Sequence, residues 1–250
     1  VGKSTVAVNL ALGLLGEGLK VGLLDADIYG PSIAMMLGVA DGVRPKSVDG
    51  KRLEPVLAQG LASMSMAYLV DAKTAMAWRG PMAAGALQQM LQHTEWGELD
   101  ALLVDLPPGT GDIQLTLSQK AQVAGAVIVT TPQDIALLDA QKGIEMFAKV
   151  NIPVLGIVEN MAMHHCSACG HSEAIFGSGG GAMLADTYAT ALLGQLPLDA
   201  AVREAGDSGQ PIVIAAPQSP SAVSYAAIAR AVIVALDDCE IAPSPDIVFD

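Results

Sequence analysis

The chain has 250 residues, 52% of them hydrophobic, which is enough to bury a large core within one α/β domain. Its formal net charge of −13 argues against nucleic acid and anionic membrane surfaces as partners, because both attract clustered Lys and Arg. No apolar stretch is expected to reach the roughly 18 residues of a membrane span, and three cysteines without a secretory leader predict a reducing, cytoplasmic setting.

Apolar residues recur with helical or strand spacing along the chain. The predicted helices cover residues 4–15, 31–37, 81–93, 135–149 and 221–236. The predicted buried strands cover residues 20–24, 99–104, 127–130 and 154–158, whereas residues 38–68 are expected to form strands and loops. Strands and helices alternate at intervals of about 30 residues, which is typical of βαβ units. We therefore expect an α/β fold with a doubly wound, mostly parallel sheet flanked by helices.

The pattern contains no internal repeat and no low-complexity linker, so it predicts one P-loop ATPase domain over residues 1–250. The first five residues, V-G-K-S-T, are the second half of a G-x-x-x-x-G-K-[ST] loop. We expect the domain to be truncated at its N-terminus within this loop, after the strand that leads into it. Residues 238–250 combine acidic residues with prolines, and we expect this tail to be disordered.

The start of the first predicted helix carries a candidate phosphate site. Backbone N–H groups at a helix N-terminus can cradle phosphate oxygens, Lys3 can reach the β- and γ-phosphates, and Ser4 can ligate Mg²⁺. The candidate ATP-binding residues here are Gly2, Lys3, Ser4 and Thr5. The alternative is that half of a motif stands at a helix start by chance, and two strand-end carboxylates argue against it.

Carboxylates follow two predicted strands, at the sheet edge where doubly wound folds bind their ligands. Asp105 ends one strand and can hold Mg²⁺ through water. Asp27 can position or deprotonate the attacking water, while Asp25 orders the turn. Capping of the following helices is the alternative role, and it has most weight for Asp25. Lys3, Asp27 and Asp105 are thus the predicted catalytic residues of ATP hydrolysis.

Two later segments can complete the nucleotide site. Residues 107–112, P-P-G-T-G-D, form a turn that is stiff and then permissive, as a γ-phosphate-sensing switch requires, or an ordinary loop. Asn160 ends a predicted strand and offers a donor–acceptor pair to the nucleotide base. Pro197 and Asp199 follow a later strand, where a loop can close over the ring. Turn chemistry explains these three residues equally well.

The pair Cys166 and Cys169 forms a C-x-x-C turn, which places two thiolates within reach of one metal centre. Two thiolates are half of the four that a [4Fe–4S] cluster or a structural zinc takes. A two-fold axis can bring two such turns together around a bridging [4Fe–4S] cluster. The alternatives are a zinc site that adds His164 or His165 and His171, and a dithiol/disulfide switch. The third cysteine receives no role.

Motifs spread over nearly the whole chain resemble, in order, those of the Mrp/ApbC iron–sulfur carrier ATPases. They are residues 1–5 (V-G-K-S-T), 25–32 (D-A-D-I-Y-G-P-S), 78–82 (W-R-G-P-M), 105–112 (D-L-P-P-G-T-G-D), 131–134 (T-P-Q-D), 159–161 (E-N-M), the cysteine pair and 203–209 (R-E-A-G-D-S-G). This family belongs to the deviant Walker A group, with MinD, ParA and the nitrogenase iron protein. The resemblance implies a homodimer that hydrolyses ATP and transfers a [4Fe–4S] cluster to apoproteins. It also supports the roles given to Lys3, Ser4, Asp27, Asp105 and Asn160.

The chain departs from the family pattern at two places. The family loop has a further Lys ahead of Val1 that reaches phosphate across the dimer, so we expect slow hydrolysis by this chain. His164 and His165 stand where the family has an aromatic residue.

The sequence leaves three alternative functions. A MinD- or ParA-like spatial-organisation ATPase should carry a basic helix or surface, whereas residues 237–240 are acidic. The second alternative is an ATPase that carries a zinc site or a dithiol at the cysteine pair. The third is an electron-transfer protein like the nitrogenase iron protein. That protein holds its cluster through cysteines far apart in sequence, so the C-x-x-C turn disfavours this function.

Overall fold

The computed structural model describes residues 1–28, 30–69, 80–109, 111, 113, 114, 117 and 121–239 of the chain. Several motif residues lie outside this part: Tyr29, Trp78, Arg79, Thr110 and Asp112. The tail expected to be disordered lies outside it from residue 240 onward.

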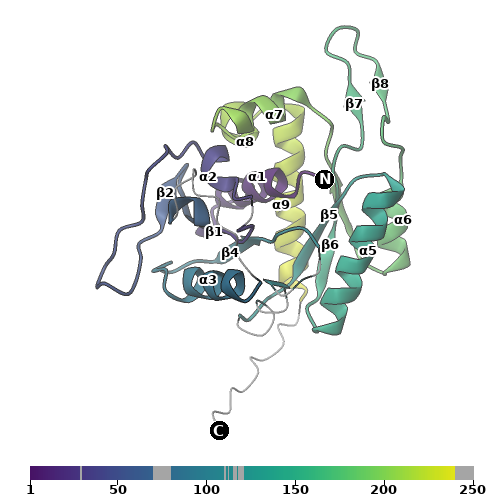
Figure 1. Cartoon of the computed structure of the whole chain (residues 1–250). Helices are drawn as coiled ribbons and strands as arrows, with labels where there is room; N and C mark the ends of the chain where they lie inside the picture. Colours follow the sequence, from purple (N-terminus) through teal and green to yellow (C-terminus); the bar gives the residue numbers. More distant parts are fainter. Residues whose placement is uncertain are drawn as a thin grey trace.

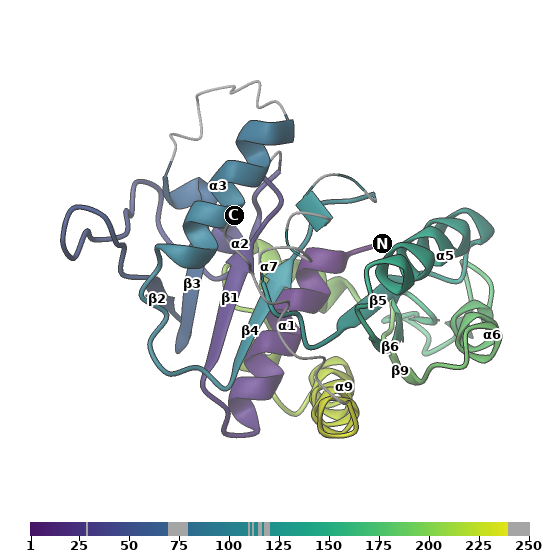
Figure 2. The same ribbon diagram turned by 90° about the horizontal axis from the view of Figure 1, so that it is seen from below.

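Seven of the described strands form two sheets that lie side by side, and two short strands form a separate hairpin (Figures 1 and 2). The first sheet has the order β2 (Val56–Ala58), β3 (Leu61–Ser65), β1 (Val21–Asp25) and β4 (Ala101–Asp105). The second has the order β5 (Ala126–Thr130), β6 (Val154–Glu159) and β9 (Leu192–Gln195). Within these two sheets, all neighbouring strands run parallel except β2 and β3. The predicted α/β class with a mostly parallel sheet is confirmed, but β4 and β5 are not paired with each other.

Helices cover both faces of these sheets (Figure 2). On one face, α1 (Lys3–Gly16) and α9 (Pro220–Asp237) pack against each other and against strands of both sheets. On the other face, α3 (Gly80–Gln92) covers the first sheet, while α5 (Asp134–Lys149) and α6 (Gly180–Thr187) cover the second. Adjacent residues of β1 point to opposite faces of the sheet: Leu23 is buried in the cluster with α1, and Leu24 in the cluster with α3. This alternation is what a strand covered on both faces requires.

Shorter elements complete the chain. They are α2 (Ile33–Met36), the 3₁₀ turn η1 (Met66–Tyr68), β7 (His164–His165), β8 (Ser172–Glu173), α7 (Ala200–Asp207) and α8 (Ile212–Ala215). The antiparallel pair β7 and β8 forms a hairpin that projects beyond the body of the domain (Figure 1). We call residues 160–179, which run from the end of β6 to the start of α6, the cysteine hairpin.

Helix α9 meets the length and hydropathy of a membrane span, with 18 residues and a mean hydropathy of 1.3. The expectation that no stretch reaches this length is therefore corrected for this helix. Its buried residues include Tyr225, Ile228 and Ala229, which belong to the core cluster shared with α1 and β1. Packing within the domain thus accounts for the apolar residues on one face of the helix, and a third of its residues are buried.

Candidate functional site

The N-terminus of α1 has the geometry of a phosphate site. Gly2 adopts a left-handed conformation with φ of 75°, and Val6 donates the first helical hydrogen bond to the Gly2 carbonyl. The preceding N–H groups, those of Lys3, Ser4 and Thr5, therefore face the helix N-terminus, where an anion can accept from them. A Cβ on Gly2 would stand 2.6 Å from Nδ2 of Asn160, so both the φ angle and the space require glycine here.

Lys3 and Asp105 form the centre of the candidate site. Nζ of Lys3 lies 2.8 Å from Oδ1 of Asp105, whose side chain is fully shielded while that of Lys3 is 31% exposed. The second carboxylate oxygen, Oδ2, is buried and has no hydrogen-bond partner in the described part of the protein. Buried polar atoms are almost always paired, and Mg²⁺ and its water shell favour such oxygens. The residues present thus fit a magnesium ion held between Ser4 and, through water, Asp105.

Asp25 organises the turn between β1 and α2, as its place at a strand end predicts. Its buried carboxylate accepts from four groups: the N–H of Asp27, Ser32 and Ile33, and the hydroxyl of Ser65. Burial raises the pKa of Asp25 to about 7, and the neighbouring charge of Asp105 adds to this effect. The two aspartates are register partners on adjacent strands.

Asp27 is half-buried in the loop that follows β1. Its Oδ1 accepts the Gly30 N–H at 3.3 Å, and the preceding residue, Ala26, donates its N–H to the Asp105 carbonyl at 2.9 Å. The loop of Asp27 is therefore tied to the strand end that carries Asp105. Its role toward an attacking water stays a prediction.

The loop after Asp105 is held by a residue that the sequence did not single out. Nε2 of the buried Gln114 donates to the carbonyls of Pro107 and Gly109, at 3.1 and 2.9 Å. Gly109 has a φ of 94°. In the predicted switch turn, the prolines thus restrict the backbone and Gly109 adopts a positive φ. The two hydrogen bonds from Gln114 hold the loop in place.

Asn160 contacts the phosphate loop directly. Its Nδ2 donates to the Val1 carbonyl at 2.9 Å, and its Oδ1 accepts the Met161 N–H at 3.0 Å. The residue is 7% exposed. The amide predicted for the nucleotide base is therefore engaged by the chain itself, and its contact with adenine stays a prediction.

Asp199 is a helix cap in this structure. Its Oδ1 accepts the Ala201 N–H at 2.9 Å at the start of α7, and its Oδ2 accepts the Ser221 hydroxyl at 2.6 Å in α9. Pro197 is half-buried in the segment after β9 that pairs with the base of the cysteine hairpin. Turn chemistry, the alternative stated from sequence, accounts for both positions, and a role over the nucleotide ring stays a prediction.

The two cysteines lie in the turn between β7 and β8. The Cys166 N–H donates to the His171 carbonyl at 2.9 Å, and the Gly170 N–H returns to the Cys166 carbonyl at 2.8 Å. The pKa of Cys166 is below its usual value because the Ala168 N–H, then the N–H and thiol of Cys169, donate to its sulfur. Both thiols are free, and Cys169 is exposed. The turn thus presents two adjacent sulfurs, one of them readily ionised, as metal binding requires.

The histidines beside the thiols point to other partners. Nδ1 of His164 lies 3.2 Å from the Leu198 carbonyl, and Nδ1 of His165 lies 2.7 Å from the Ser172 hydroxyl. Within the described residues, no three His, Cys, Asp or Glu side chains gather as a metal site. The single-chain zinc site is therefore not assembled in that part of the chain.

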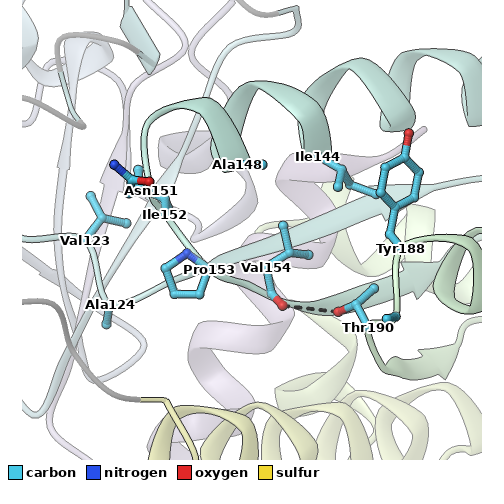
Figure 3. A pocket seen from close by; sticks show the side chains of 11 residues that line it. Val123, Ala124, Ile144, Ala148, Asn151, Ile152, Pro153, Val154, Tyr188 and Thr190 are labelled. Carbon is cyan, nitrogen blue, oxygen red and sulfur yellow. Dashed lines mark hydrogen bonds between the residues drawn. The ribbon is translucent and has the colours of Figure 1, made fainter.

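A cavity of about 530 Å³ lies at the opposite edge of the second sheet (Figure 3). Its walls come from segments that precede β5, β6 and β9, together with the side chains of Ile144 and Tyr188. The candidate site lies where the parallel strands end, so this cavity, where they begin, is not part of it.

Comparison with known proteins places these features in a family context. The model of the ParA family described as NUBPL iron-transfer P-loop NTPase matches residues 1–233. The chain is similar to the iron-sulfur cluster carrier protein of Pseudomonas fragi, with 60% identity over 229 residues that cover 92% of this chain and 80% of that protein. It is 60% identical to the iron-sulfur cluster carrier protein of Escherichia coli over 236 residues, which cover 94% of this chain but 64% of that protein. The chain thus spans less than two thirds of the Escherichia coli relative.

A solved structure gives the same picture for the fold. The nucleotide-binding protein from Archaeoglobus fulgidus in complex with ADP matches with a TM-score of 0.74 and 39% identity, over 89% of this chain and 85% of that one. The family match over residues 1–233 includes both the phosphate-loop segment and the cysteine hairpin.

Proposed function

Because the chain belongs to the ParA family of NUBPL-type iron-transfer P-loop NTPases, we propose that it is an ATP-dependent carrier of iron–sulfur clusters that delivers them to apoproteins. The family resemblance predicted from sequence is confirmed by the family match and by the relatives named as cluster carriers. The observation that carries the proposal is the hairpin turn with two adjacent free thiols, Cys166 and Cys169.

The cargo is a [4Fe–4S] cluster shared by a homodimer. Each chain supplies two thiolates, whereas such a cluster takes four, so a two-fold axis through the hairpin turns completes the ligand set. The projection of the hairpin beyond the body of the domain supports this arrangement, because it leaves the turn accessible to a second copy (Figure 1). The net charge of −13 supports partners other than nucleic acid or anionic membranes, and the three free cysteines support a reducing, cytoplasmic setting.

Hydrolysis of ATP uses the residues at the strand ends. The N–H groups at the start of α1 and the ammonium of Lys3 bind the β- and γ-phosphates, so Lys3 exchanges its bond with Asp105 for phosphate oxygens. Ser4 and, through water, Asp105 would hold Mg²⁺, which when bound would withdraw charge from the phosphates. Asp27 accepts a proton from the attacking water. At the same time the water oxygen bonds to the γ-phosphorus, and the bond from that phosphorus to ADP breaks.

We propose that the two sheets belong to one domain, as predicted from sequence. In this proposal a strand ahead of Val1 pairs with both β4 and β5 and so joins the two sheets. The facing edge strands β4 and β5 have no partner on that side among the described residues. Four of the five residues of β4 are only half-buried although helices cover the sheet on both faces. A longer chain that includes the preceding residues should have a higher free energy of unfolding, measured by urea titration. An equal value would contradict the proposal.

Anaerobic reconstitution with iron and sulfide tests the carrier function. We expect the chain to take up about four irons per dimer, with a broad visible absorption. Cys166→Ser and Cys169→Ser should each abolish this uptake, whereas Cys239→Ser, which lies beyond the end of α9, should retain it. A Cys166→Ser variant that still holds four irons per dimer would overturn the proposal, as would uptake of zinc alone.

A further inference from the structure

A buried carboxylate lies at the base of the cysteine hairpin and has no part in the hydrolysis described above. Glu159, the last residue of β6, is 0% exposed. One of its oxygens accepts the N–H of Gly181, and the other accepts Nε2 of Gln195 at 2.6 Å. A buried charge costs free energy unless it is fully hydrogen-bonded, and here both oxygens have a partner.

Glu159 and its partner Gly181 lie at the two ends of the hairpin, whereas its other partner, Gln195, is the last residue of β9. The chain leaves β6 for the hairpin directly after Glu159 and returns at Gly180 and Gly181, the first turn of α6. A Cβ on Gly181 would stand 2.9 Å from the Cβ of Glu159, so glycine permits the close approach. The bond between Glu159 and Gly181 therefore closes the base of the hairpin, and Gln195 ties it to β9.

The residue after Glu159 ties the same point to the phosphate loop. The Asn160 N–H donates to the Thr130 carbonyl at 2.8 Å, and its side chain donates to the Val1 carbonyl at 2.9 Å. The first arm of the hairpin is held further along, where the Ala162 N–H donates to the Leu196 carbonyl and the Leu198 N–H donates to the Met163 carbonyl. The end of β6 is thus the common anchor of the hairpin and of the loop at the start of α1.

We propose that Glu159 is a positioning residue of the cysteine hairpin. By closing the hairpin base at the strand end that also holds Val1, it fixes where Cys166 and Cys169 stand relative to the nucleotide site. The functional meaning of this position rests on the proposed carrier function, whereas the positioning itself is a property of the cluster-free chain.

Hydrogen exchange on the cluster-free protein tests the positioning. Glu159→Gln keeps the shape but places an amide donor where the carboxylate accepted two bonds, so one bond is lost. We expect amide exchange in residues 160–179 to rise roughly tenfold or more, with α9 unchanged. Glu145→Gln is the matched control, because Glu145 accepts from Tyr188 at the other end of α6 at an exposed position, and it should leave the hairpin unchanged.

The double variant Glu159→Gln/Gln195→Glu separates positioning from a general loss of packing. The new amide at position 159 can accept from Gly181 and donate to the new carboxylate at position 195, so both bonds return. We expect hairpin exchange to return to the wild-type rate. Exchange that stays unchanged in Glu159→Gln, that rises equally in α9, or that is not restored in the double variant would each overturn the proposal.

A milder variant and a cluster readout complete the test. Gln195→Ala removes one bond at an exposed residue, and it should raise hairpin exchange by a smaller factor even if Glu159→Gln does not fold. In reconstituted protein, Glu159→Gln should lose iron to a chelator several-fold faster at unchanged nucleotide affinity. If the wild type takes up no iron, the carrier function fails, while the exchange data still decide whether Glu159 positions the hairpin.

Discussion

Lys3 and Asp105 are separated by 102 residues in sequence, yet Nζ of one lies 2.8 Å from Oδ1 of the other. The pair joins the first residue of α1 to the last residue of β4, and the carboxylate is fully shielded from solvent. In the absence of nucleotide, the lysine thus neutralises a buried charge that would otherwise be uncompensated. If Lys3 binds phosphate as proposed, it releases the carboxylate when the nucleotide enters.

Lys3→Met should therefore destabilise the nucleotide-free protein. Removal of the ammonium leaves the Asp105 carboxylate buried with no charged partner, which costs roughly 1–3 kcal/mol. Urea unfolding measures this loss. The double variant Lys3→Met/Asp105→Asn should recover most of it, because the unpaired charge is gone. Strictly additive losses would show that the pair does not interact in solution.

Asp105→Asn alone should separate nucleotide binding from hydrolysis. The amide keeps the volume of the carboxylate but removes the charged oxygen predicted to hold Mg²⁺ through water. We expect ATP hydrolysis to fall by roughly 100-fold while ADP affinity without Mg²⁺ changes little. A phosphate-release assay and a fluorescent nucleotide titration measure the two quantities. Hydrolysis at the wild-type rate would remove Asp105 from the catalytic residues.

Asp25 predicts how the stability of the protein depends on pH. Its pKa rises from 3.8 to about 7 in the folded protein because of burial, so the folded state binds its proton more tightly than the unfolded state. The stabilisation that this proton gives is complete below about pH 4 and is lost as pH rises toward 7. We expect the free energy of unfolding in Asp25→Asn to fall less over this range than in the wild type.

A surface aspartate provides the control for that measurement. Asp49 is exposed, and backbone and side-chain hydrogen bonds with Arg52 hold its pKa well below its usual value. Its contribution therefore has the opposite sign and is lost only at acidic pH. Asp49→Asn should leave the slope between pH 5 and 7 unchanged, and an equal effect of both variants would contradict the assignment to Asp25.

Much of the fold could be predicted because several strands are short apolar runs, and β1, β4 and β6 end in Asp or Glu. The predicted strand at residues 20–24 and the helix at 135–149 agree with β1 and α5 to within one residue. The separation into two sheets could not be predicted, because periodicity shows which residues are buried but not which strands pair. The hairpin strands β7 and β8 have two residues each, too few for an alternating pattern.

The sequence predicted individual residues of the candidate site but not the contacts between them. Lys3 and Asp105 were each singled out by motif, but their mutual bond depends on tertiary contacts that spacing does not contain. Glu159 stands in one of the family motifs but received no role, and Gln114 was not singled out, because Glu and Gln side chains are usually exposed. Their burial follows from α6 and the switch loop folding over them.

The remaining prediction concerns Asp199, for which the sequence allowed both a helix cap and a contact with the nucleotide ring. As a cap, it holds the Ala201 N–H of α7 and the Ser221 hydroxyl of α9. Asp199→Ala should then lower the free energy of unfolding by about 1 kcal/mol, and Asp199→Asn by less, since the amide oxygen still accepts from α7. Thermal unfolding and a nucleotide titration, run on both variants, separate the roles. If the cap is its whole role, ATP affinity stays at the wild-type value in both, whereas a parallel loss of affinity in Asp199→Asn assigns the carboxylate to the nucleotide as well.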